Sequence, residues 1–486
     1  MKTLQEILYK VPIEGVSGNT GLLISDVVFD SRRVSNQALY VAQKGTHVDG
    51  HDFIDQAIEK GAHAIVCEEL PKVCHSHCTY IVVLNASKAL GIIASNYYDN
   101  PSNKLQLVGV TGTNGKTSVS TLLFRLFEGQ GFSCGLISTV GIQYASQSIV
   151  NTHTTPDAIT LNHHFASMVN EGVTHCFMEV SSHGIAQNRI EGIHFAGGIF
   201  TNLTHDHLDY HGDFKTYRDI KKIFFDQLPS SAFALSYLDD KNGAFMLQNT
   251  KAKKYFYALH QNADFKAQVL ECQFSGMLLK MEDMEVWTQL VGAFNVQNLL
   301  AVFATSRLME LPALEVLQQI SKLQPVKGRF QTFQNPELIT VVVDYAHTPD
   351  ALENVLKTIN EIRTRNEKLY TVIGCGGNRD KEKRPIMGQI ATALSDKVIF
   401  TSDNPRDEDP AEIISQMING VEPQHFKKVL KITHREEAIV MAGQLAHKGD
   451  IVLIAGKGHE DYQEIAGKRI PFSDMELAQK IFLKPQ

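Results

Sequence analysis

The stretch Gly109-Val110-Thr111-Gly112-Thr113-Asn114-Gly115-Lys116-Thr117-Ser118 decides the fold of the middle of this chain. It follows the apolar run Leu105-Gln106-Leu107-Val108 and precedes a helical pattern over Val119 to Phe127, so we predict a strand, a glycine-rich turn and a helix N-terminus. Backbone N–H groups of such a turn point at one anion, Lys116 supplies a positive charge, and the Thr117 hydroxyl can ligate a magnesium ion held by nucleotide phosphates. The stretch therefore predicts a nucleoside triphosphate site.

The spacing of this loop departs from the usual phosphate-binding motif G-x-x-x-x-G-K-[ST]. Five residues rather than four separate Gly109 from Gly115. A chance glycine-rich turn is the alternative interpretation. The strand before the loop and the helix after it favour phosphate binding.

Length and composition are those of a globular chain with several domains. At 486 residues the chain is too long for one core and suits about three domains. The net charge of -7 argues against a protein that coats nucleic acid. No apolar run is long enough to span a bilayer, and the N-terminus lacks a signal-peptide pattern. Seven cysteines, an odd number, fit reduced thiols. We therefore expect a cytoplasmic protein with small-molecule ligands and with neither a nucleic-acid partner nor a membrane.

One short segment, Cys74-His75-Ser76-His77-Cys78, gathers side chains that can ligate zinc. Neighbours this close rarely surround one tetrahedral ion, and no second ligand pair follows at the usual spacing. A surface loop is the preferred interpretation.

The strand and helix patterns divide the chain into three parts. Residues 1–98 indicate a small mixed domain, and Asn100-Pro101-Ser102-Asn103 follows as a turn-rich linker. Residues 99–331 alternate strands with helices, as a parallel sheet with helices on both faces would. Residues 332–486 restart with the buried run Leu338 to Val343 and indicate a Rossmann-like α/β domain. The predicted fold class is α/β with three domains: a small mixed N-terminal domain, a central P-loop-type domain and this C-terminal domain.

Four predicted strands of the C-terminal part each run into a polar or glycine-rich motif. Ligands of open α/β sheets bind beyond the carboxyl ends of the strands, so these motifs predict one site. A dinucleotide-binding fingerprint is rejected, because Arg379 stands where its third glycine should be. The motifs are Asp344-Tyr345-Ala346-His347-Thr348-Pro349, Gly374-Cys375-Gly376-Gly377-Asn378-Arg379-Asp380, Asp403-Asn404-Pro405-Arg406 and Gly456-Lys457-Gly458-His459-Glu460.

Two predicted strands of the middle part also end in polar residues. The first delivers Glu179 and then Ser181-Ser182-His183, and the next delivers the run Asn202 to His211. A carboxylate and imidazoles at adjacent strand ends beside a phosphate loop suit a divalent cation, because magnesium prefers oxygen ligands. Capping and turn residues are the alternative interpretation.

These motifs resemble those of the Mur ligases, which build the stem peptide of peptidoglycan, and the resemblance covers the whole chain. Within that family, their order and spacing are closest to the ligases that add the third residue. The resemblance implies three domains, ATP as co-substrate, magnesium, and amide formation through an acyl phosphate. The matching motifs are Gly112-Thr113-Asn114-Gly115-Lys116-Thr117, Glu179-Val180-Ser181-Ser182-His183, Asp206-His207-Leu208-Asp209-Tyr210-His211, Asp344-Tyr345-Ala346-His347 and Gly456-Lys457-Gly458-His459-Glu460.

The resemblance implies roles at the nucleotide. Lys116 holds the β- and γ-phosphates, Thr117 and Glu179 bind the first magnesium, and His207 binds the second. Lys221 matches a lysine that the family carbamylates, which turns a cation into a carboxylate-like metal ligand. His347 supports the geometry of the nucleotide or phosphate. The remaining implied ATP contacts are Asn295, Asn298, Arg329 and Asp344.

The resemblance also implies a site for UDP-N-acetylmuramoyl-L-alanyl-D-glutamate. Ser31 and Thr46-His47-Val48 match the uridine-binding loops of the N-terminal domain. His153 departs from the pattern, since some relatives have Asn there. Arg189 would neutralise carboxylate or pyrophosphate charge. The residues that match the muramoyl-peptide contacts are Thr154, Thr155, Ser181, Gln187 and Arg189.

The amino acid to be added is indicated by Asp403-Asn404-Pro405-Arg406, which resembles the form of this motif in ligases that add meso-2,6-diaminopimelate. The distal end of that molecule carries a carboxylate and an ammonium, for which Arg406 offers bidentate donors and Asn404 a carbonyl oxygen. Lysine ends in an ammonium alone, which a buried arginine would repel. An ordinary turn is the alternative for this motif. Arg379, Gly456 and Glu460 match the remaining family contacts.

The predicted reaction joins meso-2,6-diaminopimelate to the γ-carboxylate of the D-glutamyl residue through an acyl phosphate, with closure of the C-terminal domain before chemistry. A monomer is expected. The alternatives are the lysine-adding form of the same ligase, folylpolyglutamate synthetase, and a P-loop switch without ligase chemistry. The N-terminal domain before the phosphate loop and the motif at Arg406 disfavour folylpolyglutamate synthetase, and the motifs at the C-terminal strand ends disfavour a switch.

Overall fold

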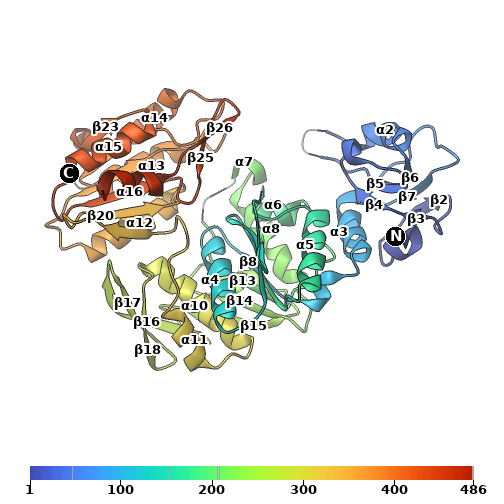
Figure 1. The fold of residues 1–486 in the computed structure, drawn as a ribbon, viewed down its shortest axis with the longest axis horizontal. Coiled ribbons are helices and arrows are strands. Elements are labelled where there is room, and N and C mark those ends of the chain that lie inside the picture. The colour runs from blue at the N-terminus through green and yellow to red at the C-terminus, as the bar shows by residue number, and fades with distance from the viewer. Residues whose placement is uncertain (46–47, 152, 205, 207, 484–486) are drawn as a thin grey trace.

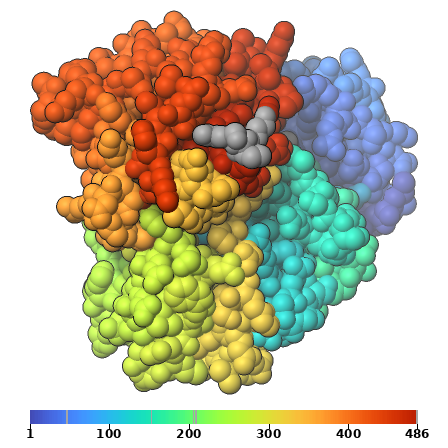
Figure 2. Space-filling model, turned by 60° about the vertical axis from the view of Figure 1, so that its left-hand side comes forward, coloured from blue at the N-terminus to red at the C-terminus, as the bar shows by residue number. Residues whose placement is uncertain are grey.

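A computed structural model describes residues 1–45, 48–151, 153–204, 206 and 208–483. The ribbon forms successive lobes in chain order, with the N-terminal lobe in blue, the middle in cyan to yellow, and the C-terminal lobe in orange and red (Figure 1). On the face shown in the space-filling view, the C-terminal lobe lies directly against the middle of the molecule (Figure 2). None of the helices in the described ranges combines the length and apolar character that crossing a membrane requires.

The N-terminal lobe is built on a small sheet whose inner strands are parallel. Its strand order is β2 (Gly15–Ser17), β7 (Thr79–Val82), β6 (Ala62–Cys67), β5 (Ala38–Val41) and β4 (Asp26–Val28), with β2 antiparallel to β7. The helices α1 (Leu4–Ile7), α2 (Ile54–Glu59) and α3 (Ala86–Tyr97) pack with it. The segment between β6 and β7 contains an exposed Cys74 and a buried Cys78.

The predicted linker is a packed connection. Residues Pro101–Lys104 form a 3-10 helix, with Pro101 and Ser102 buried. The Ser102 hydroxyl accepts a hydrogen bond of 3.0 Å from the backbone N–H of His194. A side chain on Gly91 of α3 would collide with Glu191, 2.6 Å away. The N-terminal lobe is therefore tied to the middle of the chain by close contacts on both sides of the connection.

The central sheet places the phosphate-binding loop at its middle. The strand before the loop, β8 (Gln106–Thr111), lies between β12 (His175–Glu179) and β13 (Gly197–Phe200), and all three are parallel. The order across the sheet is β11 (Gln147–Ile149), β10 (Gly141–Tyr144), β9 (Cys134–Ser138), β12, β8, β13, β14 (Phe233–Tyr237), β15 (Lys253–Ala258), β16 (Phe265–Gln273), β17 (Gly276–Met281) and β18 (Met284–Thr288).

The predicted parallel arrangement is confirmed for the middle of the central sheet, and antiparallel strands extend the sheet at both ends. The sheet is parallel from β9 to β16, but β10 and β11 are antiparallel at one end, and β17 and β18 are antiparallel at the other. Short turns between these outer strands leave no room for the crossover that a parallel pair requires. Alternating apolar residues do not reveal strand direction, so the sequence pattern could not distinguish the two arrangements.

Helices cover both faces of the central sheet, as predicted. The face under α4 (Lys116–Gly129), α10 (Ala293–Leu308) and α11 (Ala313–Ile320) forms one apolar core, in which Leu122 and Leu299 pack with Val108 and Val110. On the other face, α5 (Ala158–Asn170) and α8 (Phe214–Asp226) form a second core, in which Phe165 and Phe224 pack with strand residues. The shorter helices α6 (Ser182–Ala186), α7 (Leu208–His211) and α9 (Gly243–Met246) complete this part.

The C-terminal lobe is a mostly parallel sheet, in agreement with the predicted α/β domain. Its order is β19 (Gln331–Gln334), β20 (Thr340–Asp344), β24 (Ile451–Ala455), β21 (Leu369–Ile373), β22 (Lys397–Phe400) and β23 (Val429–Lys431), with β19 antiparallel to β20. Strand β20 starts later than predicted, because Leu338 has a φ of 64° and belongs to the preceding turn. The helices are α12 (Pro349–Ile362), α13 (Lys383–Leu394), α14 (Pro410–Ile418), α15 (Arg435–Leu445) and α16 (Asp474–Phe482), and β25 (Tyr462–Ile465) pairs with β26 (Lys468–Pro471) as a hairpin.

Candidate active site

The phosphate-binding loop requires its glycines. Gly112 and Gly115 have φ angles of 147° and 89°, which L side chains rarely adopt. A Cβ atom on Gly112 would lie 1.9 Å from the Thr201 hydroxyl oxygen, and one on Gly115 would lie 2.6 Å from Oδ1 of Asn298. The loop thus packs its backbone against β13 and α10, so its peptide groups can come close to a ligand.

Two lysines converge on the same loop. Lys116 Nζ donates to the carbonyl oxygens of Gly112 and Thr113 at 2.9 and 2.8 Å, and Lys221 Nζ, from α8, donates to that of Gly112 at 2.9 Å. Burial lowers the pKa of Lys116 and, with the nearby charge of Lys116, lowers the pKa of Lys221 well below its ordinary value. The neighbouring Lys222 instead pairs with Asp226 at 2.6 Å. The two adjacent lysines therefore have different environments, and only Lys221 faces the loop.

Oxygen ligands suited to magnesium lie beside these lysines. Glu179, 1% exposed at the end of β12, accepts hydrogen bonds from the Thr139 N–H at 2.8 Å and hydroxyl at 3.3 Å. Thr117 Oγ1, in the first turn of α4, accepts a bond of 3.2 Å from Arg329 Nη2. A hydroxyl and a carboxylate beside a phosphate loop fit magnesium, and Thr204 Oγ1 near the loop is buried without a partner among the described residues. The expected second ligand, His207, lies outside the described residues.

The residues matched to the muramoyl peptide form one network next to Glu179. Thr155 Oγ1 donates to the carbonyl oxygen of Glu179 at 2.8 Å and accepts from the N–H of Ser181 at 2.9 Å. Arg189 donates to the Thr155 carbonyl oxygen at 2.6 Å and to Oε1 of Gln187 at 2.6 and 3.0 Å. Thr154 accepts from the Thr139 hydroxyl at 3.2 Å, which links the network to the carboxylate. The structure thus brings all five matched residues together.

The N-terminal residues matched to uridine lie apart from this network. Ser31 is buried and donates to Oε1 of Gln56 at 3.0 Å, while Val48 is 58% exposed. Thr46 and His47 lie outside the described residues. A long substrate with its nucleotide end on this lobe would have to extend to the middle of the molecule.

The residues matched to the base and ribose of ATP lie where the middle and C-terminal parts meet. Asn295 and Asn298 are buried in the first turns of α10, and Asn298 contacts the phosphate loop. Arg329 stacks on the Tyr345 ring at 4.5 Å, and its Nε is buried without a partner among the described residues. Asp344 accepts from two backbone N–H groups, and burial raises its pKa to about 6.

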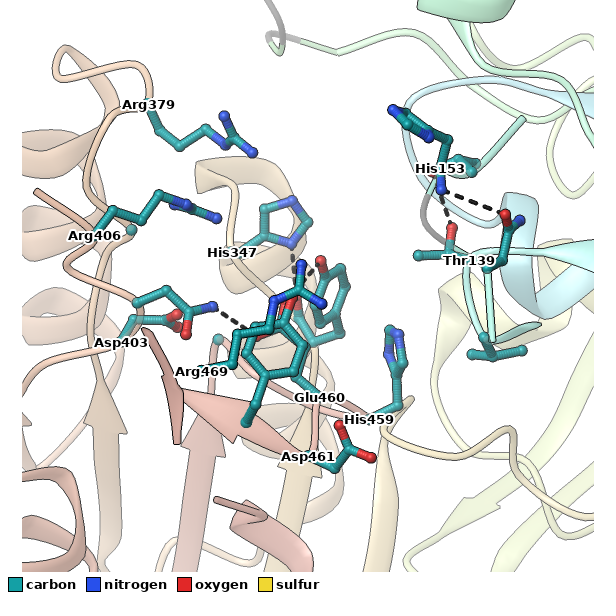
Figure 3. A pocket seen from close by; sticks show the side chains of 18 of the residues that line it. Thr139, His153, His347, Arg379, Asp403, Arg406, His459, Glu460, Asp461 and Arg469 are labelled. Atoms are coloured by element: carbon teal, nitrogen blue, oxygen red, sulfur yellow. Dashed lines mark hydrogen bonds between the residues drawn. The ribbon is translucent and has the colours of Figure 1, made fainter. Parts of the chain in front are cut away.

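A cavity of about 540 Å³ lies between the central and C-terminal sheets. Figure 3 shows Thr139 and His153 on one wall and the arginines Arg379 and Arg406 on the opposite wall. His347 also lines it: its Nδ1 donates to the Tyr345 carbonyl oxygen at 2.8 Å, which leaves Nε2 as an acceptor, and burial lowers its pKa to about 4. The cavity therefore has Thr154 of the muramoyl-peptide network on one side and residues of all four C-terminal strand-end motifs on the other.

The two loops that carry the arginines are joined to each other. Arg406 has a φ of 51°, and its Nη1 donates to the Gly377 carbonyl oxygen at 2.7 Å. Its Nε lies 3.3 Å from a carboxylate oxygen of Glu464. Arg379, on the loop after β21, is exposed. Both guanidinium groups extend into the cavity, as needed to bind a carboxylate (Figure 3).

The environment of Asn404 differs from the sequence expectation. Its carbonyl oxygen was expected to accept from a ligand ammonium, but it accepts from Lys457 Nζ at 3.0 Å and from the N–H of Glu464 at 2.9 Å. Its amide nitrogen donates to Glu460 at 2.8 Å. Gly456, with a φ of 116°, turns next to the carboxylate of Asp403, which a Cβ atom would approach to 2.5 Å. Asn404 thus orients neighbouring groups within the protein.

Sequence reasoning missed several residues of this site. Lys457 is fully buried between two predicted contacts, and its place between two glycines of a quoted motif was an available signal. Arg384 is also fully buried and forms a bidentate pair with Glu408 at 2.8 and 3.0 Å. The partners of that pair are 24 residues apart and belong to none of the quoted motifs, so the sequence gave no signal for the contact.

Three domain descriptions match the chain in order. They are "Mur ligase family, catalytic domain" over residues 23–98, "Mur ligase middle domain" over 110–306 and "Mur ligase, glutamate ligase domain" over 328–458. The phosphate loop, the three lobes and the cavity between the sheets agree with these matches, and together they define one family of ligases. The chain belongs to the Mur ligase family.

Similar proteins with known names indicate which members of that family this chain resembles. UDP-N-acetylmuramoyl-L-alanyl-D-glutamate--2,6-diaminopimelate ligases from Cytophaga hutchinsonii and Bacteroides fragilis are each 51% identical to this chain, over 98% and 99% of both chains. A solved structure with that name is 32% identical, with a TM-score of 0.71 over 99% of this chain and 98% of the other. A MurF ligase from Thermotoga maritima in complex with ADP, 19% identical, shares the fold with a TM-score of 0.63 over 94% of this chain and 96% of the other.

Proposed function

We propose that this chain is an ATP-dependent ligase of peptidoglycan precursor synthesis. It joins meso-2,6-diaminopimelate to the γ-carboxylate of the D-glutamyl residue in UDP-N-acetylmuramoyl-L-alanyl-D-glutamate. The single observation that carries this proposal is the cavity, which has Thr139 and Thr154, bonded to each other beside Glu179, on one wall and Arg379 and Arg406 on the other. The printed names of relatives at 51% identity support the same substrates.

The residues of the middle part would activate the peptide. Lys116 and the loop N–H groups bind the ATP phosphates, and the γ-carboxylate oxygen attacks the γ-phosphorus, so that the bond to ADP breaks and an acyl phosphate forms. Magnesium held by Thr117 and Glu179 would supply neutralisation of phosphate charge. Arg189 and Thr155 orient the peptide beside Glu179. Positioning and charge neutralisation supply most of the rate.

The residues of the C-terminal part would bind the incoming amino acid. Its amine nitrogen attacks the acyl carbon, the bond to the phosphate oxygen breaks, and the displaced phosphate takes up a proton released from the nitrogen. Arg379 and Arg406 hold the distal carboxylate. Glu460, which lines the cavity and binds Lys457 through Oε2, accepts from the distal ammonium through Oε1. A monomer in the cytoplasm is part of the proposal.

Carbamylation of Lys221 is also part of the proposal. The reaction needs a neutral amine, and the burial that lowers the Lys221 pKa favours that form. A carbamate at this position would place a negative charge beside Lys116 and so replace repulsion by attraction. It would also add an oxygen ligand near the phosphate loop.

The test is an ATP-dependent ligation assay that offers meso-2,6-diaminopimelate and L-lysine in parallel, with phosphate release and peptide product both measured. Phosphate release should require the UDP-muramoyl dipeptide and meso-2,6-diaminopimelate together. A preference for lysine would instead support the lysine-adding form. Nucleotide hydrolysis without product, and independent of the amino acid, would support a P-loop switch.

A further inference from the structure

Lys457 is a buried cation in the wall of the amino-acid site. Its side chain is 0% exposed, and its Nζ donates to Oε2 of Glu460 at 2.9 Å and to Oδ1 of Asn404 at 3.0 Å. It lies between Gly456 and Gly458, whose φ angles of 116° and 52° turn the chain sharply on either side. Burying an ammonium is costly unless it is paired and hydrogen-bonded, so this arrangement specifies where Lys457 must lie.

The hydrogen bonds of this cluster determine which acceptor is left for a ligand. Oδ1 of Asn404 already accepts from Lys457 and from the N–H of Glu464. Oε2 of Glu460 accepts from Lys457 and from Nδ2 of Asn404. Oε1 of Glu460 receives only a long contact of 3.5 Å from the Tyr345 hydroxyl among the described residues. That oxygen is therefore the acceptor best placed for an ammonium entering the cavity.

We propose that Lys457 is a positioning residue of the amino-acid site, which holds Glu460 as an oriented carboxylate so that its Oε1 receives the distal ammonium of the amino acid. This inference rests on the proposed function and names a residue that acts on the ligand only through Glu460. It also assigns Asn404 the role of fixing the Lys457–Glu460 pair, in place of a direct contact with the ammonium.

The charges around Glu460 explain why it needs this partner. Burial and the nearby carboxylate of Asp403 raise the Glu460 pKa, whereas Lys457 and Asn404 lower it. Further titratable groups around it are the phenols of Tyr345 and Tyr462, the buried guanidinium of Arg435, and Arg469, which lies over the Tyr462 ring and lines the same cavity. Without Lys457, the pKa of Glu460 would rise further. The protonated form, a poorer acceptor for an ammonium, would then persist to higher pH.

The experiment measures KM for meso-2,6-diaminopimelate between about pH 6 and pH 9 for wild type and Lys457→Met. At neutral pH, we expect the variant's KM to be about tenfold above that of wild type, with kcat and the KM for ATP close to wild type. The ratio of the two KM values should fall as the pH rises, because Glu460 regains its charge, and it should stay above one, because the carboxylate lacks the bond that orients it. The amino acid ionises in the same way in both experiments, so its own titration cancels when the KM of the variant is divided by that of wild type.

Two further variants separate this role from a structural one. Lys457→Met combined with Glu460→Gln removes the titrating carboxyl, so its KM ratio should not change with pH. Lys457→Arg keeps the cation and should follow the wild-type profile. Lys428→Met is the matched control, since Lys428 donates to two backbone carbonyls at 2.9 Å elsewhere in the same lobe.

Each outcome supports or overturns the positioning role proposed for Lys457. A KM ratio for Lys457→Met that is constant with pH would overturn the proposal, because general loosening of the site affects all pH values alike. If Lys457→Met does not fold, a profile of Lys457→Arg that departs from wild type overturns it, and one that matches wild type supports it. Absence of ligation by the wild-type protein itself would instead refute the proposed function.

Discussion

Asn114 of the phosphate-binding loop donates a hydrogen bond of 2.8 Å from its Nδ2 to Oδ2 of Asp350, in the first turn of α12. These residues are 236 positions apart in the sequence, and their contact joins the central domain to the C-terminal one. Arg329, just before the C-terminal part begins, donates to Thr117 at the start of α4. The C-terminal part of the chain therefore touches the loop directly.

The first prediction concerns the charge of Asp350. Burial raises the pKa of this carboxyl, and its ionised form places a negative charge at the rim of a loop that would bind phosphates. Asp350→Asn should therefore bind ATP a few-fold more tightly in calorimetric titrations. Glu353→Gln is the control, because Glu353 lies on the same helix and pairs with Lys357. Weaker ATP binding by Asp350→Asn would contradict the prediction.

The second prediction separates the two adjacent lysines of α8. Lys221→Ala should lose nearly all ligase activity, because Lys221 contacts the phosphate loop. Lys222→Ala should retain most of the activity, because Lys222 pairs with Asp226 and lies near the Phe245 ring instead of bonding the loop. Isotope-labelled bicarbonate should give a carbamate resonance in wild type and in Lys222→Ala, and none in Lys221→Ala. The same resonance in Lys221→Ala would place the modification elsewhere.

The third prediction concerns bidentate recognition by Arg406. Arg406→Lys keeps the charge and meets the same backbone strain at a φ of 51°, but it loses the planar donor pair. We expect kcat/KM for meso-2,6-diaminopimelate to fall about 100-fold, which corresponds to about 2.7 kcal/mol, with ATP binding unchanged. Arg363→Lys is the control, since Arg363 pairs with Asp396 far from the cavity lining. An equal loss in both variants would argue against recognition by Arg406.

The fourth prediction concerns the pair between Arg384 and Glu408, which joins the loops carrying the two arginines of the cavity. The Arg384 hydrogen bonds lower the Glu408 pKa from 4.5 to about 2. A carboxyl whose pKa is lower in the folded state stabilises the fold above its unfolded pKa, and this contribution is lost as the pH falls from about 4.5 to about 2. Glu408→Gln should therefore lower the thermal midpoint at neutral pH and reduce its further fall over that interval.

The exposed Glu361 of α12 supplies the control for this experiment, and Glu361→Gln should retain the wild-type dependence of the thermal midpoint on pH. A Glu408→Gln variant with the wild-type acid profile would show that the pair does not stabilise the fold. Arg384→Met should in addition raise the KM for meso-2,6-diaminopimelate, because the Gly376 carbonyl oxygen would lose its donor and Glu408, which accepts from the Asn378 N–H, would lose the partner that holds it.

Local patterns in the sequence predicted the elements that place the site. The strand before Gly109, the helix after Gly115 and the strands that run into the motifs at Gly374 and Asp403 are all confirmed, because each depends on a run of adjacent residues. The direction of the outer strands and the bonds of Asn404 could not be predicted. Both depend on partners distant in the sequence, such as Lys457, which is 53 residues from Asn404.

Buried ion pairs could not be predicted from the sequence either, because their partners are distant in the chain. Arg435 and Asp474 are both fully buried and paired at 2.6 Å, yet 39 residues separate them. A charged residue in an amphipathic helix is usually interpreted as exposed, and only the fold shows that it faces an opposite charge. Roles that depend on such pairs require the three-dimensional structure.

The parallel sheet of the C-terminal lobe carries Arg379, Arg406 and Glu460 on loops after β21, β22 and β24, which are neighbours in the sheet. The phosphate-binding loop follows a strand of the other sheet. Under the proposed function, changes in a few loop residues at one sheet edge would alter the amino acid that is accepted and leave the phosphate-binding loop unchanged. An antibiotic directed at the phosphate loop would, for the same reason, be less exposed to resistance through changes in amino-acid choice.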